Sequence, residues 1–183
     1  QGNGNGHKLT IEGDYLGTQF TLNNGSVLHV KGEYRIQEIE GRDCTLIIGS
    51  ESAQIVVDQD FRIQKKQSDG SYTETSAYLK TSGELKIIVK GDFYTESNNS
   101  ENMLCKGGIL ELYGDFYQTG NSIFNVSWPA DGKVVFAGDS LQHIIMDSNR
   151  GYIRNIKQTE SCPGLVFNCT AGTISLASDI ISN

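Results

Sequence analysis

The sequence predicts an all-β fold, a single-stranded right-handed parallel β-helix of about seven irregular coils. A strand-and-corner motif recurs along the chain, and apolar residues alternate with polar ones at the two-residue period of strands. The 183 residues include 21 glycines but only 2 prolines, which suits many turns between regular strands. Right-handedness follows from the general preference of crossover connections. The alternative is an antiparallel β-sandwich, which allows uneven spacing but does not explain a recurring corner.

The recurring motif is clearest within Gly107–Gly120, as Leu110-x-Leu112-x-Gly114-Asp115-Phe116. Its corner position falls at 13, 32, 59, 91, 114 and 138, which are glycines except for Gln59. The resulting spacings of 19, 27, 32, 23 and 24 residues are typical of stacked repeats. A glycine at the corner would permit a positive φ or a close backbone approach. Because one unit cannot bury its own apolar face, the units are expected to stack.

The composition of the other segments predicts how the rest of the chain is organised. Residues 1–6 are predicted to be a flexible linker, and 7–183 a single β-solenoid domain. The polar insertion 62–76 is predicted to form a hairpin around Asp69-Gly70 that protrudes from the stack. A looser strand leads into most corners, for example at Ala77–Gly83 and Leu165–Gly172. The last strands lack a polar cap, so we expect the chain to be part of a longer protein.

The aromatic residue after each corner shares parity with the core leucines. We therefore expect an inward ladder of stacked rings, formed by Tyr15, Tyr34, Phe61, Phe93 and Phe116. Their neighbours Tyr94 and Tyr117 would then point outward. Together with Tyr113, and with the only tryptophan, Trp128, they are the candidate ligand surface. Such a surface either grips a carbohydrate or simply covers the sheet.

An acidic residue follows the corner position in each copy: Asp14, Glu33, Asp60, Asp92, Asp115 and Asp139. In register, these carboxylates would lie about 4.8 Å apart and repel one another by roughly 1 kcal/mol in water. We expect each acid to accept hydrogen bonds from the amides of its own turn. Calcium between neighbours is the alternative, with Asp92, Asp115 and Asp139 as candidate ligands. No other cofactor is predicted.

Composition and motifs exclude several function classes. The net charge of −7 and the lack of a basic cluster beyond Lys65-Lys66 argue against a nucleic-acid partner. No apolar run approaches a membrane span. The histidines are far apart and no nucleophile, zinc or phosphate-loop motif is present, so no catalytic residue is assigned. Acids are plentiful, which leaves glycoside hydrolysis open.

The four cysteines have no metal-binding spacing, and their number does not decide the redox compartment. We expect Cys105 and Cys169 to be small buried side chains. A local disulfide between Cys162 and Cys169 is the less favoured alternative. Cys44 has no assigned role.

The segments Gly114–Gly120 and Gly132–Ile144 resemble secreted bacterial β-strand-repeat proteins. The later segments 151–156 and 164–168 look similar, each with paired short strands around a turn. The resemblance implies an extracellular or bacterial cell-surface setting, in which such repeats form stalks, adhesin shafts or accessory modules. It also implies neighbouring domains in the same chain, and a host or cell-surface glycan or protein as partner.

From these observations we expect a non-enzymatic structural or adhesive module of a bacterial surface or secreted protein. The alternative is a carbohydrate-binding or polysaccharide-active β-helix module that uses an outward face or the 62–76 loop. A polysaccharide lyase would want a basic residue beside an acidic metal cluster, and no pattern ties the nearest candidates, Arg154 and Lys157, to acids.

Overall fold

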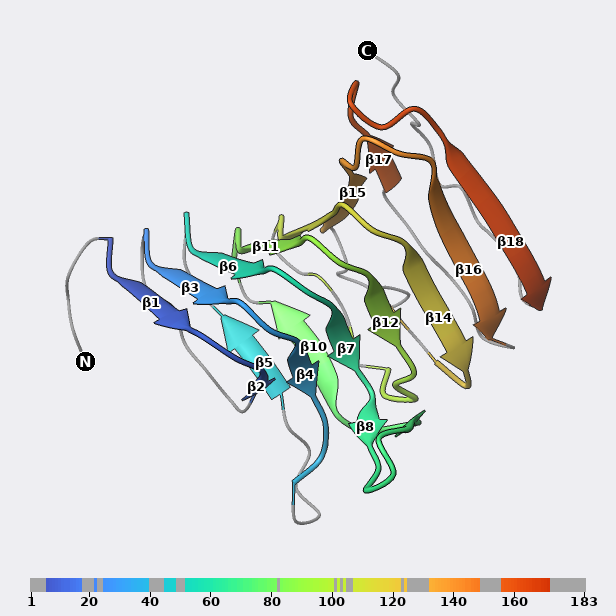
Figure 1. Ribbon diagram of the computed structural model, residues 1–183, viewed down its shortest axis with the longest axis horizontal. Helices are drawn as coiled ribbons and strands as arrows, with labels where there is room; N and C mark the ends of the chain where they lie inside the picture. Colours follow the sequence, from blue (N-terminus) through green and yellow to red (C-terminus); the bar gives the residue numbers. More distant parts are fainter. Residues whose placement is uncertain are drawn as a thin grey trace.

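The computed structural model describes residues 6–17, 22, 25–39, 45–48, 52–81, 83–100, 102, 104, 107–122, 124, 132–148 and 156–171. These residues form strands and turns without a helix, and two seven-stranded parallel sheets dominate (Figure 1). The predicted parallel β-helix is therefore confirmed. The sandwich alternative is wrong, because the only antiparallel pair in the described strands is a short hairpin. Handedness stays a prediction. No described helix could cross a membrane.

Each coil gives one strand to each large sheet, so the coils stack as rungs in chain order (Figure 1). The first sheet runs β1 (Lys8–Ile11), β3 (Val27–Val30), β6 (Gln54–Val57), β11 (Lys86–Val89), β13 (Ile109–Leu112), β15 (Lys133–Phe136) and β17 (Ile156–Gln158). The second runs β2 (Tyr15–Gly17), β4 (Tyr34–Ile36), β7 (Phe61–Ile63), β12 (Phe93–Thr95), β14 (Phe116–Gly120), β16 (Gln142–Ser148) and β18 (Leu165–Ala171). A third side of the stack carries the pair β5 (Thr45–Ile48) and β10 (Tyr78–Thr81).

Strand pairing reproduces the alignment of the sequence motif. Leu9, Leu28, Ile55, Ile87, Leu110 and Val134 follow one another in register across the first sheet. From Leu28 onward these side chains are fully buried, whereas Leu9 at the outer edge is 53% exposed. Alternation along each strand thus sends one row into the core and its neighbours outward.

The inward aromatic ladder is confirmed. Tyr34 stacks on Phe61 with ring centroids 4.7 Å apart, Phe61 on Phe93 at 5.5 Å, and Phe93 on Phe116 at 5.4 Å. All four rings are fully buried. Tyr15 meets Tyr34 edge-on and is half-buried. Each such pair adds about 0.5–1.5 kcal/mol beyond burial, so the ladder stabilises the stack rung by rung.

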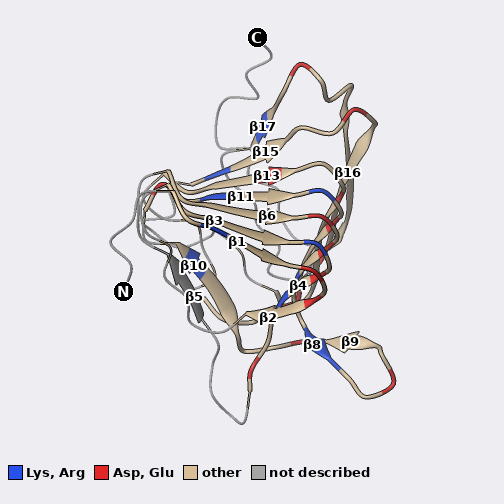
Figure 2. Cartoon of the chain, turned by 60° about the vertical axis from the view of Figure 1, so that its left-hand side comes forward, with Lys and Arg blue, Asp and Glu red and all other residues tan. Residues whose placement is uncertain are grey.

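The polar insertion contains the predicted hairpin, although its first residues, Arg62 and Ile63, belong to β7 of the second sheet. Strands β8 (Lys65–Lys66) and β9 (Tyr72–Thr73) pair antiparallel. Gly70 adopts a φ of 87°, which a side chain would oppose. Figure 2 shows the hairpin standing away from the two large sheets.

Three expectations for the C-terminal part of the chain are wrong. The segment beginning at Leu165 is the last strand of the second sheet rather than a lead-in strand, because it pairs in parallel with β16. Cys169 is exposed and Cys162 is buried, and both are free thiols, so neither the burial of Cys169 nor the local disulfide holds. Cys44 and Cys105 lie outside the described residues.

The corner glycines serve close approach rather than positive φ. At Gly91 an added Cβ would lie 2.6 Å from Asp60 Oδ1 and 2.7 Å from the carbonyl carbon of Gln59. Carboxylate oxygens of the preceding rung crowd Gly32 and Gly114 in the same way. None of these glycines has a positive φ. The Gly-Asp pair is therefore a consequence of stacking, since one rung's acid occupies the space that the next rung's side chain would need.

We predict that Gly91→Ala lowers the free energy of unfolding by about 1–3 kcal/mol, because the backbone of Gln59 must move to admit the methyl group. Gly13→Ala is the matched control, since an added Cβ there meets nothing within 4 Å. Its effect should stay within about 0.5 kcal/mol. Urea denaturation of both variants measures the difference, and equal stability would contradict the close-approach explanation.

Candidate functional site

The corner acids form a hydrogen-bonded ladder between rungs. The Oδ1 atom of Asp92 accepts a bond from the Asp115 amide at 2.8 Å, and that of Asp60 accepts from the Asp92 amide at 3.0 Å. Asp14 accepts from the Glu33 amide at 2.9 Å. Each aspartate thus binds the amide of the next rung's acid and not, as predicted, those of its own turn.

The second oxygens of Asp60, Asp92 and Asp115 each bind a side chain two residues further along the same rung. Arg62 Nη2 lies 2.6 Å from Asp60 Oδ2, and the Tyr94 hydroxyl donates to Asp92 Oδ2 at 3.0 Å. The Tyr117 hydroxyl lies 3.4 Å from Asp115 Oδ2. These donors offset the repulsion expected between stacked carboxylates.

The ladder is interrupted where the motif departs from Gly-Asp. Gln59 replaces the glycine in the third copy and Glu33 replaces the aspartate in the second. The Glu33 carboxylate turns instead to Arg35, at 2.6 Å, and to the Tyr72 hydroxyl, at 2.6 Å. Within the described residues, the Asp60 amide has no bond to Glu33.

Asp139 does not belong to the acid row, which corrects the prediction for the sixth copy. Three residues separate Leu112 from Phe116, but seven separate the partners of those residues, Phe136 and Ile144. The chain therefore makes a four-residue excursion at 138–141, and Asp139 is exposed on it. His143 takes the next place in the row, and its amide donates to Asp115 Oδ1 at 2.7 Å.

Gln142 closes the excursion from inside. Its side chain is 1% exposed, and its Oε1 accepts a bond from the Gly138 amide at 2.9 Å. Its Nε2 donates to the carbonyl of Leu112 at 3.2 Å and also contacts that of Gly114. The glutamine thus replaces the backbone contacts that the corner of the preceding coil makes.

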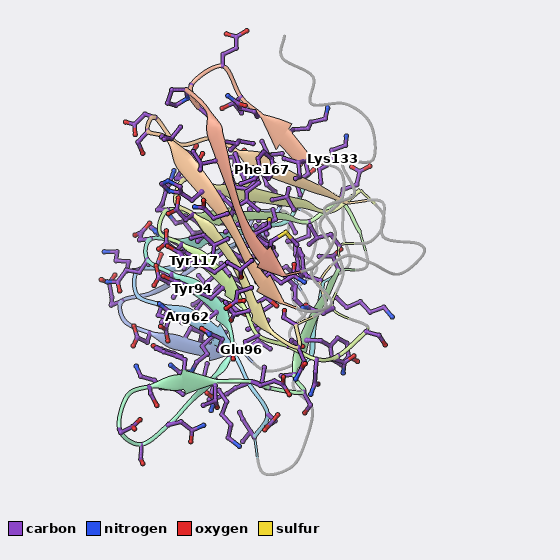
Figure 3. All side chains as sticks on the ribbon, turned by 90° about the vertical axis from the view of Figure 1, so that its right-hand side faces the viewer. Arg62, Tyr94, Glu96, Tyr117, Lys133 and Phe167 are labelled. Atoms are coloured by element: carbon purple, nitrogen blue, oxygen red, sulfur yellow. The ribbon has the colours of Figure 1, made fainter. Side chains whose placement is uncertain are left out.

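The outward tyrosines are placed only partly as predicted. Tyr94 and Tyr117 do lie side by side outside the second sheet, with parallel rings 4.5 Å apart (Figure 3). Tyr113 instead packs against Lys90, whose Nζ lies 3.6 Å from the ring centroid. Trp128 lies outside the described residues. The structure therefore brings two of the four candidate residues together.

Both faces of the Tyr94 ring are covered. Tyr117 stacks on one face, and the Arg62 guanidinium lies 3.7 Å from the ring centroid. Burial, followed by the hydrogen bond to Asp92, raises the pKa of Tyr94 above its ordinary value. Tyr94 is thus half-buried and neutral, and it presents ring edges rather than a flat face.

Arg62 links the outward tyrosines, Tyr94 and Tyr117, to the hairpin. The Tyr72 ring covers its guanidinium at 4.3 Å, and its Nε lies 2.9 Å from Glu33 Oε2 without hydrogen-bond geometry. Arg62 was not among the predicted site residues, although it shares parity with Tyr94 and Tyr117 in the register of the second sheet. Parity places Arg62 beside Tyr94, but its contact with Tyr72 depends on how the hairpin folds.

Glu38 anchors the base of the hairpin. Its Oε2 accepts bonds from the amide and the hydroxyl of Ser76, both at 2.9 Å, and from the Thr75 hydroxyl at 3.1 Å. Its Oε1 lies 3.2 Å from Lys65 Nζ. The backbone hydrogen bond from Ser76, with the side-chain bonds, lowers the pKa of Glu38 to about 2 against the opposing effect of burial.

The chemistry of this region is dominated by internal contacts. No group of three or more His, Cys, Asp or Glu within the described residues is arranged to hold a metal ion. Calcium binding at Asp92 and Asp115 stays a prediction that melting with and without a chelator would test. Comparison of the chain with family models, curated proteins and solved structures finds no match.

Removing one carboxylate of the ladder should destabilise the stack. We predict that Asp92→Ala costs about 1–3 kcal/mol, because the Asp115 amide and the Tyr94 hydroxyl lose their acceptor. Asp139→Ala removes the same charge outside the row and should change stability by less than about 0.5 kcal/mol. Chemical denaturation compares the two variants, and similar losses would show that the ladder is not responsible.

Glu38 should make stability depend on pH in the acid range. Its folded pKa of about 2 lies below the ordinary glutamate value of 4.5, so its ionised form stabilises the fold above about pH 4.5. That contribution is lost as the pH falls toward 2. We therefore expect the melting temperature of the wild type to exceed that of Glu38→Gln at neutral pH. This gap should close as the pH falls from about 4.5 to about 2. Glu160→Gln, at an exposed site, is the control and should show no such gap.

Proposed function

We propose that this chain is a non-enzymatic structural or adhesive module of a bacterial surface or secreted protein. The observation that supports this most is the ladder of corner carboxylates, which are engaged by the next rung's amides and by donors of their own rung. General acid–base catalysis needs a carboxylate that can exchange a proton with a bound substrate. Acids committed to holding rungs together favour a structural role.

The extracellular and bacterial setting rests on the resemblance of Gly114–Gly120 and Gly132–Ile144 to secreted β-strand repeats. In that setting a stacked β-solenoid holds surface side chains at regular intervals along its length. A host or cell-surface glycan or protein is the proposed partner. The stack supplies a rigid frame, and its outward faces supply the contacts.

A carbohydrate-binding role for Tyr94 and Tyr117 has less support. Sugar rings stack on the flat faces of aromatic side chains, and both faces of Tyr94 are taken by Arg62 and Tyr117. Tyr117 gives one face to Tyr94, and its neighbour in register on the other side is Ile145. These two rings are thus better suited to covering the sheet than to stacking on a sugar.

An assay for turnover combined with an assay for adhesion tests the proposal. The purified chain is incubated with a panel of neutral and acidic polysaccharides, and reducing ends and unsaturated uronates are measured against a heat-denatured sample. We expect no turnover. Beads coated with the chain should be retained under flow on at least one glycan- or protein-coated surface. Turnover of any polysaccharide above the denatured control would contradict the non-enzymatic role.

A further inference from the structure

The outer face of the first sheet differs in charge from the rest of the molecule. Its outward positions form two rows that run across the strands in register. The ionisable residues that the structure describes there are four lysines, one glutamate and one histidine: Lys8, Lys86, Lys133, Lys157, Glu111 and His29. The whole chain carries a net charge of −7, so this face is locally basic on an acidic protein.

Acidic residues gather elsewhere. Figure 2 shows blue lysines on β11, β15 and β17 of the first sheet, and red acidic residues along the corner toward the second sheet. In Figure 3, Lys133 lies on the opposite side of the stack from Arg62, Tyr94 and Tyr117. The lysines of the first sheet and the acids of the corner ladder therefore lie on different parts of the stack.

Three lysines of this face have no partner in the described part of the chain. The side chains of Lys8, Lys133 and Lys157 make no ion pair, hydrogen bond or ring contact there. Other lysines are engaged: Lys86 with Glu111 at 2.7 Å, Lys31 at the end of β3 with Glu12 at 2.9 Å, and Lys65 with Glu38 at 3.2 Å. Among the described residues of the two large sheets, free ammonium groups therefore lie only on the outer face of the first sheet.

The outward side chains between the lysines are aliphatic. Val56, Ile88, Ile109 and Val135 point outward from the same sheet and are half-buried. No outward residue that the structure describes on these strands is aromatic. Lys86 and Lys133 are two strands apart in one row, which corresponds to about 10 Å. The result is a flat surface with spaced positive charges and apolar contacts between them.

We propose that the outer face of the first sheet binds an acidic polysaccharide, with Lys133 and Lys157 as the main cationic contacts. This inference rests on the proposed adhesive function and names its partner class. Spaced ammonium groups match a polymer with widely separated carboxylates or sulfates, and the valine and isoleucine side chains can contact the C–H faces of its sugars.

Other polyanions fit this face less well. A nucleic acid carries a far denser row of charges than lysines about 10 Å apart can neutralise. Base stacking needs aromatic side chains, and the described outward residues of the first sheet include none. An anionic membrane would also attract lysines, so vesicles form one arm of the test.

The test measures binding of the full chain to immobilised polygalacturonate and chondroitin sulfate, with methyl-esterified polygalacturonate as the neutral counterpart. We expect wild type to bind an acidic polymer and not the ester, and binding to weaken with added salt. Lys133→Gln with Lys157→Gln should lower the affinity by about fivefold for each lysine. The corresponding double arginine variant should retain binding, because it keeps both charges.

The matched control is Lys66→Gln with Lys80→Gln, which removes the same charge from the hairpin and from β10 on the third side of the stack and should change affinity by less than about twofold. Three results would overturn the proposal: wild type binds neither acidic polymer, the control loses as much affinity as the Lys133 and Lys157 variant, or phosphatidylserine vesicles are bound as tightly as the polysaccharides. Each is independent of the turnover assay, so this proposal can fail while the non-enzymatic role stands.

Discussion

In-register parallel stacking is the constraint on which the rest of the structure depends. Strands of successive rungs lie about 4.8 Å apart, so every side chain meets its equivalent in the neighbouring rung. Apolar and aromatic residues gain from this repetition, as the stacked rings of Phe61, Phe93 and Phe116 show. Acids would lose from it, and the structure resolves the conflict by giving one carboxylate oxygen to the next rung and the other to a donor on the same rung.

Parity and motif spacing predicted much of the core. The aligned leucines, the ring ladder and the 62–76 hairpin follow from local patterns, because strand alternation fixes which residues face inward. The sixth corner was mispredicted because Gly138-Asp139 matches the motif while the strand resumes four residues later than expected. Register there depends on burial of Ile144 and on the bonds of Gln142, and neither is visible in the local pattern.

The candidate site was harder to predict for a different reason. Sequence parity placed Tyr94 and Tyr117 outside the sheet, but whether a ring face is open depends on its neighbours along the stack. Arg62 covers Tyr94, and Tyr72 from the hairpin covers Arg62 in turn. The outward side chains of β7, β12 and β14 consequently cover one another. The first sheet keeps unpaired lysines, so the two faces are suited to different tasks.

The excursion at 138–141 has a consequence for how this architecture can diversify. The coil lengthens at one corner, yet pairing resumes at Ile144 and the rungs on either side keep their alignment. A single buried glutamine, Gln142, is enough to seal the gap. Corner length is therefore decoupled from strand register, so evolution or an engineer could graft a recognition loop onto the rim of one coil and leave the scaffold intact.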